Sequence, residues 1–299
     1  MTTTQHLIRF LLLAGFAMLI VYLFRTGDMT LFIAPKMELL VKLSAIGLYA
    51  AAIYQLYAAL KARRKSQAAD CDCDHQHSSS RTKNIFVYSL FILPLALGFL
   101  TPTGTLGSAL AAKKGMSFTG NEMISRSATE TSSDPVSLST KGSSGNNIDN
   151  TLNELFPYDE YTVDHARLAK QLYEQPLIVV PESRFIETLT ALDLYRDAFM
   201  GKEIEISGFI YREEEMGEDR MAISRFAMNC CSADALPYGL MTTWPKANEY
   251  AEDDWVKGTG KLAISNYMEN EILTVELTKI ERIPAPASPY VYPDLEFGS

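Results

Sequence analysis

Residues 7–24 read LIRFLLLAGFAMLIVYLF, and Arg9 is the only charged residue among them. A helix needs about 20 mostly apolar residues to cross a hydrocarbon core of about 30 Å. With its tolerant ends included, this stretch therefore predicts a transmembrane helix. A cleaved signal peptide is the alternative for an apolar run so near the N-terminus, but residues 25–28, which follow, offer no small-x-small cleavage site.

Two more apolar runs follow in the first third of the chain. The run over 39–60 contains Lys42, whose long side chain can reach the interface, and Gln55, which suits helix packing or a transport path. The next run contains Pro94, which predicts a kink of the kind that membrane helices tolerate. We therefore expect three transmembrane helices, two within 1–60 and one over 85–107.

Basic residues in the loops set the expected orientation. The connection between the first two runs carries Arg25 and Lys36. The loop over 61–84 carries six basic residues: Lys61, Arg63, Arg64, Lys65, Arg81 and Lys83. Because cytoplasmic loops are enriched in Lys and Arg, we expect this loop in the cytoplasm. Three crossings then place the N-terminus in the cytoplasm and the C-terminal part outside, as in a multi-pass protein of the cell membrane.

The two halves of the chain differ in charge. Residues 1–150 contain 14 Lys and Arg against 9 Asp and Glu, whereas residues 151–299 contain 13 against 27. The acidic half excludes a nucleic-acid partner, because phosphate binding needs a positive surface. Between the apolar and acidic parts, residues 108–150 are rich in Ser, Thr, Gly and Asn and predict a flexible linker.

Residues 151–299 predict an α+β domain. Apolar residues have helical spacing over 163–173 and 184–199, and Gly201 is a natural stop for the second helix. Residues 203–211 then alternate polar and apolar side chains, which is typical of a strand. Four more runs have strand character: 221–230, 239–243, 255–264 and 272–283.

Five short strands predict a small β-barrel of the OB type from about residue 201. Gly208, Gly258 and Gly260 lie where a tightly curled sheet must bend. A fragment of a β-sandwich is the alternative. The expected fold class is a membrane α part with three transmembrane helices, followed by an extracytoplasmic α+β domain with an OB-like barrel.

The cytoplasmic loop contains metal-ligand side chains. Cys71, Cys73, His75 and His77 lie within seven residues, and thiolates and imidazoles are ligands of zinc or another soft divalent metal. Their one-residue gaps are not those of a folded zinc finger and favour a flexible segment that binds and releases a metal. A polar loop in which these residues fell together by chance is the alternative.

The remaining two cysteines are adjacent, at Cys230 and Cys231, with Asp234 close behind. Neighbouring side chains of a strand point to opposite faces, so both thiols can reach one metal only where the chain turns. A short helix capped by Ser232 would place Cys231 near its N-terminus, where a thiolate is favoured. Three interpretations remain: a vicinal disulfide, a soft-metal or thiol-reactive site with Asp234, or one buried and one exposed structural cysteine.

Other chemistry-bearing residues have simpler interpretations. His165 lies on a predicted helix face and is expected to be solvated. The acidic clusters 213–215 and 252–254 are expected to be solvated loops rather than calcium sites. The sequence contains no Gly-rich phosphate loop, no nucleophile elbow and no His-carboxylate set. The protein is therefore expected not to be an enzyme.

Several segments resemble the YcgQ-like family of subunits of two-component membrane permease complexes. They are 201–204 (GKEI), 208–210 (GFI), 229–237 (NCCSADALP) and 255–258 (WVKG), behind two apolar spans, a His/Cys loop and a third span. The segment Cys-Cys-x-Ala-Asp-Ala is the most specific of these. The resemblance implies a non-enzymatic accessory subunit encoded beside a larger multi-span permease of the YcgR type.

We therefore expect an accessory subunit of a bacterial permease complex that handles a metal or a thiol-reactive solute. A membrane-anchored metal or redox sensor is the first alternative, and an extracytoplasmic thiol-dependent enzyme is the second. Three helices are too few to form a transport path alone, which favours the accessory subunit.

Overall fold

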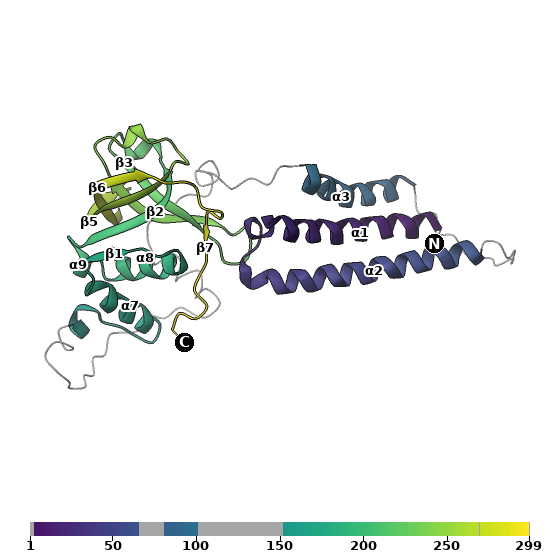
Figure 1. Cartoon of the computed structure of the whole chain (residues 1–299), viewed down its shortest axis with the longest axis horizontal. Coiled ribbons are helices and arrows are strands. Elements are labelled where there is room, and N and C mark those ends of the chain that lie inside the picture. The colour runs from purple at the N-terminus through teal and green to yellow at the C-terminus, as the bar shows by residue number, and fades with distance from the viewer. Residues whose placement is uncertain (1–2, 66–80, 101–151, 269, 299) are drawn as a thin grey trace. The chain divides into compact units, whose positions relative to one another are not determined.

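A computed structural model describes residues 3–65, 81–100, 152–268 and 270–298. The chain divides into two compact units, Met1–Gly104 and Thr105–Ser299. We call them the helical unit and the sheet unit (Figure 1). Each is described by itself.

The helical unit consists of long helices that pack along one another. Helix α1 covers Thr3–Thr26 and ends at Gly27, whose φ of 83° is a left-handed conformation that suits a helix C-terminus. Two 3₁₀ turns, η1 (Asp28–Leu31) and η2 (Pro35–Met37), reverse the chain into α2 (Glu38–Lys65). Helix α3 (Arg81–Leu100) lies against α1 (Figure 1).

The side chains of the helical unit have the burial pattern of a membrane bundle. Its buried residues are mainly small: Ala45, Ala52 and Ala59 of α2 recur every seven residues, and Ala17 of α1 is buried as well. Large apolar side chains such as Leu43 are exposed instead. Small residues allow membrane helices to approach closely while large apolar groups face lipid.

Helix α3 uses the same small-residue packing against α1. A Cβ atom added to Gly15 would lie 2.7 Å from Leu95, and one added to Gly98 would lie 2.8 Å from Leu19. The rings of Tyr22 and Phe99 also meet, with centroids 6.1 Å apart. The two helices therefore touch where glycine removes a side chain.

Two helical segments of the described chain are long and apolar enough to cross a membrane: Thr3–Thr26 and Pro35–Arg64. The apolar part of α3, Phe86–Leu100, is shorter. Residues 101–107, which the sequence assigns to the third span, lie outside the described residues. The third transmembrane helix stays a prediction.

The sheet unit begins with helices that cover a sheet. They are α7 (Val163–Tyr173), α8 (Phe185–Leu194) and α9 (Arg196–Phe199), with strand β1 (Leu177–Val179) and the turn η3 (Glu182–Arg184) between α7 and α8. The single helix expected over 184–199 is wrong, because Tyr195 interrupts it with a φ of −118° and donates its hydroxyl to the carbonyl of Pro157. Gly201 follows α9 with a φ of 76°, as expected for a helix stop.

Strand character was predicted for five runs, and all five form strands: the run over 203–211 has the predicted ends, and the other four have shifted ends. They are β2 (Glu203–Tyr211), β3 (Arg220–Ala227), β4 (Leu236–Thr243), β5 (Trp255–Tyr267) and β6 (Asn270–Arg282). The short turns η4 (Glu214–Met216) and η5 (Ala247–Glu249) lie in the connections, and β7 (Tyr290–Val291) follows near the C-terminus.

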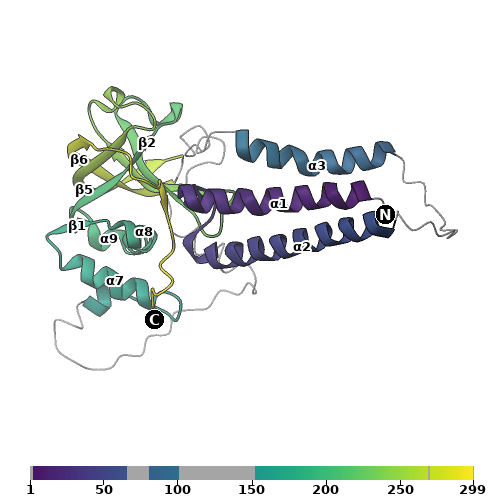
Figure 2. The same ribbon diagram turned by 45° about the vertical axis from the view of Figure 1, so that its right-hand side comes forward.

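The pairings of strands β2 to β6 form a closed cycle. Strand β2 pairs with β5, β5 with β6, β4 with β3 and β3 with β2, all antiparallel, whereas β6 pairs with β4 in parallel. Strands β1 and β7 add parallel pairs to β2 and β3 respectively. Figure 2 shows β2, β5 and β6 on one side of α7 and α8. A continuous core of inward side chains joins this sheet to α7 and α8.

Two of the sheet glycines lie where backbones approach closely. A Cβ atom on Gly208 would lie 2.3 Å from the carbonyl oxygen of Ser224 in β3. One on Gly260 would lie 2.2 Å from the carbonyl oxygen of Glu276 in β6. Any side chain at these positions would force neighbouring strands apart, so glycine is needed for the sheet to curl.

Candidate functional site

The adjacent cysteines lie in the connection between β3 and β4. Strand β3 ends at Ala227, and the N–H of Met228 donates to the carbonyl of Val291 in β7, 3.0 Å away. The chain then turns at 232–234 before β4 begins at Leu236. We call residues 228–235 the cysteine loop. One end of it is fixed by β7, and the other by the start of β4.

Asp234 holds the cysteine loop in its turn. Its carboxylate accepts hydrogen bonds from the backbone N–H of Cys230, 2.7 Å away, and of Asn229, 3.2 Å away. Its own N–H donates to the carbonyl of Cys231 at 3.0 Å. These bonds fold the chain back, so the carboxylate lies beside both cysteines.

The turn brings three metal-ligand side chains together. The Sγ atoms of Cys230 and Cys231 lie 3.7 Å apart, and one ligand atom from each of Cys230, Cys231 and Asp234 lies within 4.8 Å of the others. Both cysteines are free thiols, and both are half-buried. Thiolates with a carboxylate form a ligand set for zinc and similar ions.

The charge of Asp234 controls the nearest thiol. The Cys230 thiol donates a hydrogen bond to the Asp234 carboxylate, and this bond, followed by the contact with Cys231, raises the pKa of Cys230 to about 11. Burial alone would raise the pKa of Asp234, but hydrogen bonds from the Cys230 thiol and from the loop backbone lower it overall. The site therefore pairs a thiol with a stabilised carboxylate.

Two expectations for this loop are wrong. No helix begins at Ser232, because residues 232–234 form a turn, so Cys231 has no helix N-terminus beside it. The interpretation with one buried and one exposed cysteine also fails, since both are half-buried. The predicted strand over 221–230 ends three residues early, and this early end allows both sulfur atoms to lie on one side.

The other predicted metal ligands have no described position. Cys71, Cys73, His75 and His77 lie outside the described residues. His165 is described and is not solvated as expected. Its Nδ1 is buried without a hydrogen-bond partner among the described residues, and its ring meets Phe297 with centroids 4.9 Å apart. Burial lowers the pKa of His165.

The acidic clusters contain side chains with structural roles. Glu213 accepts hydrogen bonds from the hydroxyls of Tyr211 and Tyr267, the latter 2.9 Å away. Burial, followed by these bonds to Glu213, raises the pKa of both tyrosines. Asp254 accepts from Arg282 at 3.2 Å and from the N–H of Ala251 at 3.0 Å. Both carboxylates therefore bind protein groups rather than standing free in solvent.

Gln55 has a partner in the neighbouring helix. Its Oε1 lies 2.8 Å from Nδ1 of His6 in α1. Of the two roles that the sequence left open, this contact supports helix packing. Sequence reasoning missed His6, because nothing near it in the chain points to a residue 49 positions away.

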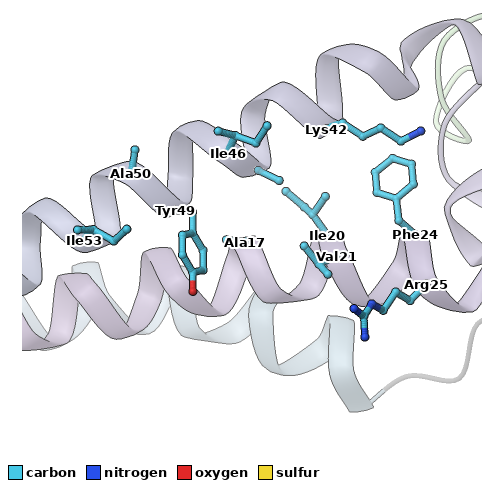
Figure 3. Close-up of a pocket in the computed structure, with 11 residues that line it drawn as sticks. Ala17, Ile20, Val21, Phe24, Arg25, Lys42, Ile46, Tyr49, Ala50 and Ile53 are labelled. Atoms are coloured by element: carbon cyan, nitrogen blue, oxygen red, sulfur yellow. The ribbon is translucent and has the colours of Figure 1, made fainter.

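The helical unit also contains an apolar groove between α1 and α2 (Figure 3). It has a volume of about 630 Å³. Two cations lie at one end, where the Lys42 amine is 4.8 Å above the ring of Phe24 and 2.9 Å from Glu38, and Arg25 is exposed. The lining residues are Ala17, Ile20, Val21, Phe24, Arg25, Lys42, Ala45, Ile46, Tyr49, Ala50 and Ile53.

Comparison with known proteins finds matches along most of the chain. The DUF1980 N-terminal domain matches residues 8–117, and the DUF1980 C-terminal domain matches residues 155–293. UPF0703 protein YcgQ of Bacillus subtilis (strain 168) is 27% identical over 95% of this chain and 98% of its own. A Streptococcus mutans serotype c (strain ATCC 700610 / UA159) protein is 26% identical over 96% of this chain and 99% of its own. It is named "Putative two-component membrane permease complex subunit".

Proposed function

The chain belongs to the DUF1980 family, whose two domains both match it, and on that basis we propose that it is a non-enzymatic accessory subunit of a bacterial membrane permease complex. The observation that carries the proposal is the near-full-length similarity to the Streptococcus mutans protein, whose name describes such a subunit. We propose that its partner in the complex is a larger multi-span permease of the YcgR type.

The helical unit supports a role as a subunit rather than an independent carrier. Large apolar side chains of α2, including Leu39, Leu43 and Ile46, are exposed, whereas small residues fill its contact with α1. Such a bundle needs lipid or further helices around it. A few helices do not enclose a path through a membrane, so the transport path belongs to the partner.

We assign the groove between α1 and α2 to a transmembrane helix of that partner. Ala17, Ala45 and Ala50 remove side-chain bulk along its lining, which permits the close approach that membrane helices use. Arg25 at its end favours a partner helix with a carboxylate at the same level. The groove thus fits a helix that is apolar along most of its length.

The proposed topology follows the loop charges. The N-terminus and residues 61–84 lie in the cytoplasm, a third helix crosses over 85–107, residues 108–150 tether the next domain, and residues 151–299 lie outside. The predominance of basic residues in 61–84 supports this arrangement. Cys71, Cys73, His75 and His77 would then form a weak, exchangeable zinc site on the cytoplasmic side.

We further propose that β2 to β6 form an OB-like barrel. The closed cycle of pairings supports it, as does the combination of four antiparallel pairs with one parallel pair between β4 and β6. In this arrangement the cysteine loop is a half-buried connection at the rim of the barrel. It is the part of the domain suited to handling a metal or a thiol-reactive solute.

Purification from native membranes tests the proposed function. The full chain should recover a multi-span partner in equal amount. Ala50→Trp fills the groove and should reduce that recovery at least several-fold, whereas Ala51→Trp, an exposed neighbour that does not line the groove, should not. Equal recovery with both variants would contradict the groove assignment. Recovery of a solitary, stable wild-type chain would contradict the accessory subunit and support the sensor.

A further inference from the structure

The separation of the two sulfur atoms in the cysteine loop matches a particular coordination geometry. Zinc binds thiolates at about 2.3 Å in tetrahedral sites, so two thiolates on one ion lie about 3.8 Å apart. The Sγ atoms of Cys230 and Cys231 lie 3.7 Å apart. An ion held in line between them at the same bond length would need them about 4.6 Å apart. The loop therefore holds the sulfur pair ready for a tetrahedral ion.

Asp234 supplies a third ligand that is already oriented. Two backbone N–H groups, of Asn229 and Cys230, fix its carboxylate at 3.2 and 2.7 Å. The carboxylate also accepts a hydrogen bond from the Cys230 thiol, and loss of that thiol proton on metal binding leaves a lone pair of the carboxylate for the metal. Hydrogen bonds of this kind orient ligands in metal sites and support their affinity.

The cysteine loop offers three protein ligands to a metal ion. Within the described residues, no other His, Cys, Asp or Glu joins Cys230, Cys231 and Asp234. Structural zinc sites have four protein ligands, whereas sites that exchange a ligand keep one position open. The half-buried setting of both thiols leaves that position accessible.

We propose that Cys230, Cys231 and Asp234 bind one Zn²⁺ ion in tetrahedral geometry, with the fourth position taken by an exchangeable water or solute ligand. Each thiol loses its proton as its sulfur bonds the ion, so two protons are released for each ion bound. Binding at this site stands on the loop geometry. Only the role of zinc as a solute of the complex rests on the proposed function.

Zinc titration of the full chain in detergent tests the proposal, with Zn²⁺ alone as the probe. Every protein compared carries Cys71→Ser, Cys73→Ser, His75→Ala and His77→Ala, which remove the predicted cytoplasmic ligands. This parent should bind one equivalent of Zn²⁺, and Co²⁺ in its place should give the charge-transfer absorption of a thiolate ligand. A parent that binds no equivalent would overturn the proposal.

Single variants then distinguish the residues that bind the metal from neighbours that do not. Cys230→Ser and Cys231→Ser should each weaken Zn²⁺ binding at least tenfold and abolish or reduce the Co²⁺ thiolate band, and Asp234→Asn should weaken binding without abolishing the band. Ser232→Ala, in the same turn, should bind like the parent. Unchanged affinity in either cysteine variant would overturn the proposal. Thermal melts of the zinc-free proteins verify that each variant is folded.

Partner recovery, scored on the same preparations, keeps the two hypotheses apart. Absent zinc binding with full partner recovery overturns the zinc site and leaves the accessory subunit standing. Intact zinc binding without any partner supports the site and contradicts the proposed function.

Discussion

Glu187 in the buried helix α8 accepts a hydrogen bond from the backbone N–H of Asp294, 2.8 Å away and 107 residues later in the chain. Arg184 reinforces this contact, because its Nε lies 2.9 Å from the Asp294 carboxylate. The second carboxylate oxygen of Glu187 is buried without a hydrogen-bond partner among the described residues. The C-terminal segment is thus attached to helix α8 through the carboxylate of Glu187, whose charged form is destabilised by burial.

This contact predicts a pH dependence of stability. Burial raises the pKa of Glu187 above its ordinary value of 4.5, despite the opposing hydrogen bond from Asp294. The folded state therefore binds the proton more tightly, so the free energy of unfolding should fall as pH rises from about 4.5 through the folded pKa. Glu187→Gln should lose this dependence. Denaturant unfolding at several pH values measures it, and parallel curves for both proteins would contradict the prediction.

Asp234 should contribute to stability independently of any metal. It accepts two backbone hydrogen bonds in the cysteine loop, and hydrogen bonds to charged groups contribute about 1.5–3 kcal/mol each. Asp234→Ala should therefore lower the free energy of unfolding by roughly 1–3 kcal/mol without zinc, and Asp234→Asn by less, because its amide oxygen remains an acceptor. Asp219→Ala, at an exposed carboxylate, is the control and should change little. Denaturation with a chelator present gives the comparison, and no loss in Asp234→Ala would be a contrary result.

The two cysteines should be alike in their effect on folding. Both are half-buried, so a serine hydroxyl at either position can reach water. Cys230→Ser and Cys231→Ser should each change the free energy of unfolding by less than about 1 kcal/mol. Thermal melts of the zinc-free full chain measure both. A large loss for one variant alone would restore the interpretation with one inward and one outward thiol.

The His6–Gln55 contact should couple α1 to α2. Hydrogen bonds between membrane helices contribute about 0.6 kcal/mol on average. A double-mutant cycle with His6→Ala and Gln55→Leu should give a coupling of this size in detergent unfolding. Among the described residues, the Ser44 hydroxyl donates to the carbonyl of Val41 in its own helix and to no residue of α1, so His6→Ala with Ser44→Ala should show no coupling. Equal coupling in the two cycles would exclude the contact as its source.

The proposed topology predicts opposite labelling of two engineered cysteines in a background without native cysteines. Arg63→Cys should react only from the cytoplasmic side. Tyr161→Cys should react from outside, and Tyr161 suits the test because its side chain is 82% exposed. A reagent that does not cross membranes distinguishes the sides. Reaction of both positions from the same side would contradict the three-span topology.

Structural elements that depend on the local pattern of residues were predicted from the sequence. Those that depend on contacts with residues far along the chain were missed. Alternation along 203–211 and the stop at Gly201 were sufficient for β2 and the end of α9. The end of β3 was not predictable, because residues 228–230 continue its pattern while Met228 bonds Val291 of β7 instead. No local signal marks that bond.

The same limit applies to the helical unit. Helix α2 is apolar around most of its surface, so its sequence does not show which side meets α1. In the structure, the buried side of α2 is the one that carries Ala45, Ala52 and Ala59. The pairing of His6 with Gln55 and the groove beside Tyr49 depend on which side is buried. For the candidate site, the neighbouring positions of Cys230 and Cys231 in the sequence indicated the pair. Their approach to Asp234 depends on the turn at 232–234, which the structure shows.

The mass of the intact complex after gentle purification from native membranes tests the accessory subunit most directly. Native mass spectrometry should give one dominant species whose mass equals this chain plus a multi-span permease in a fixed ratio, and its dissociation should release both. A dominant species with the mass of this chain alone, or of its own oligomer, would contradict the account.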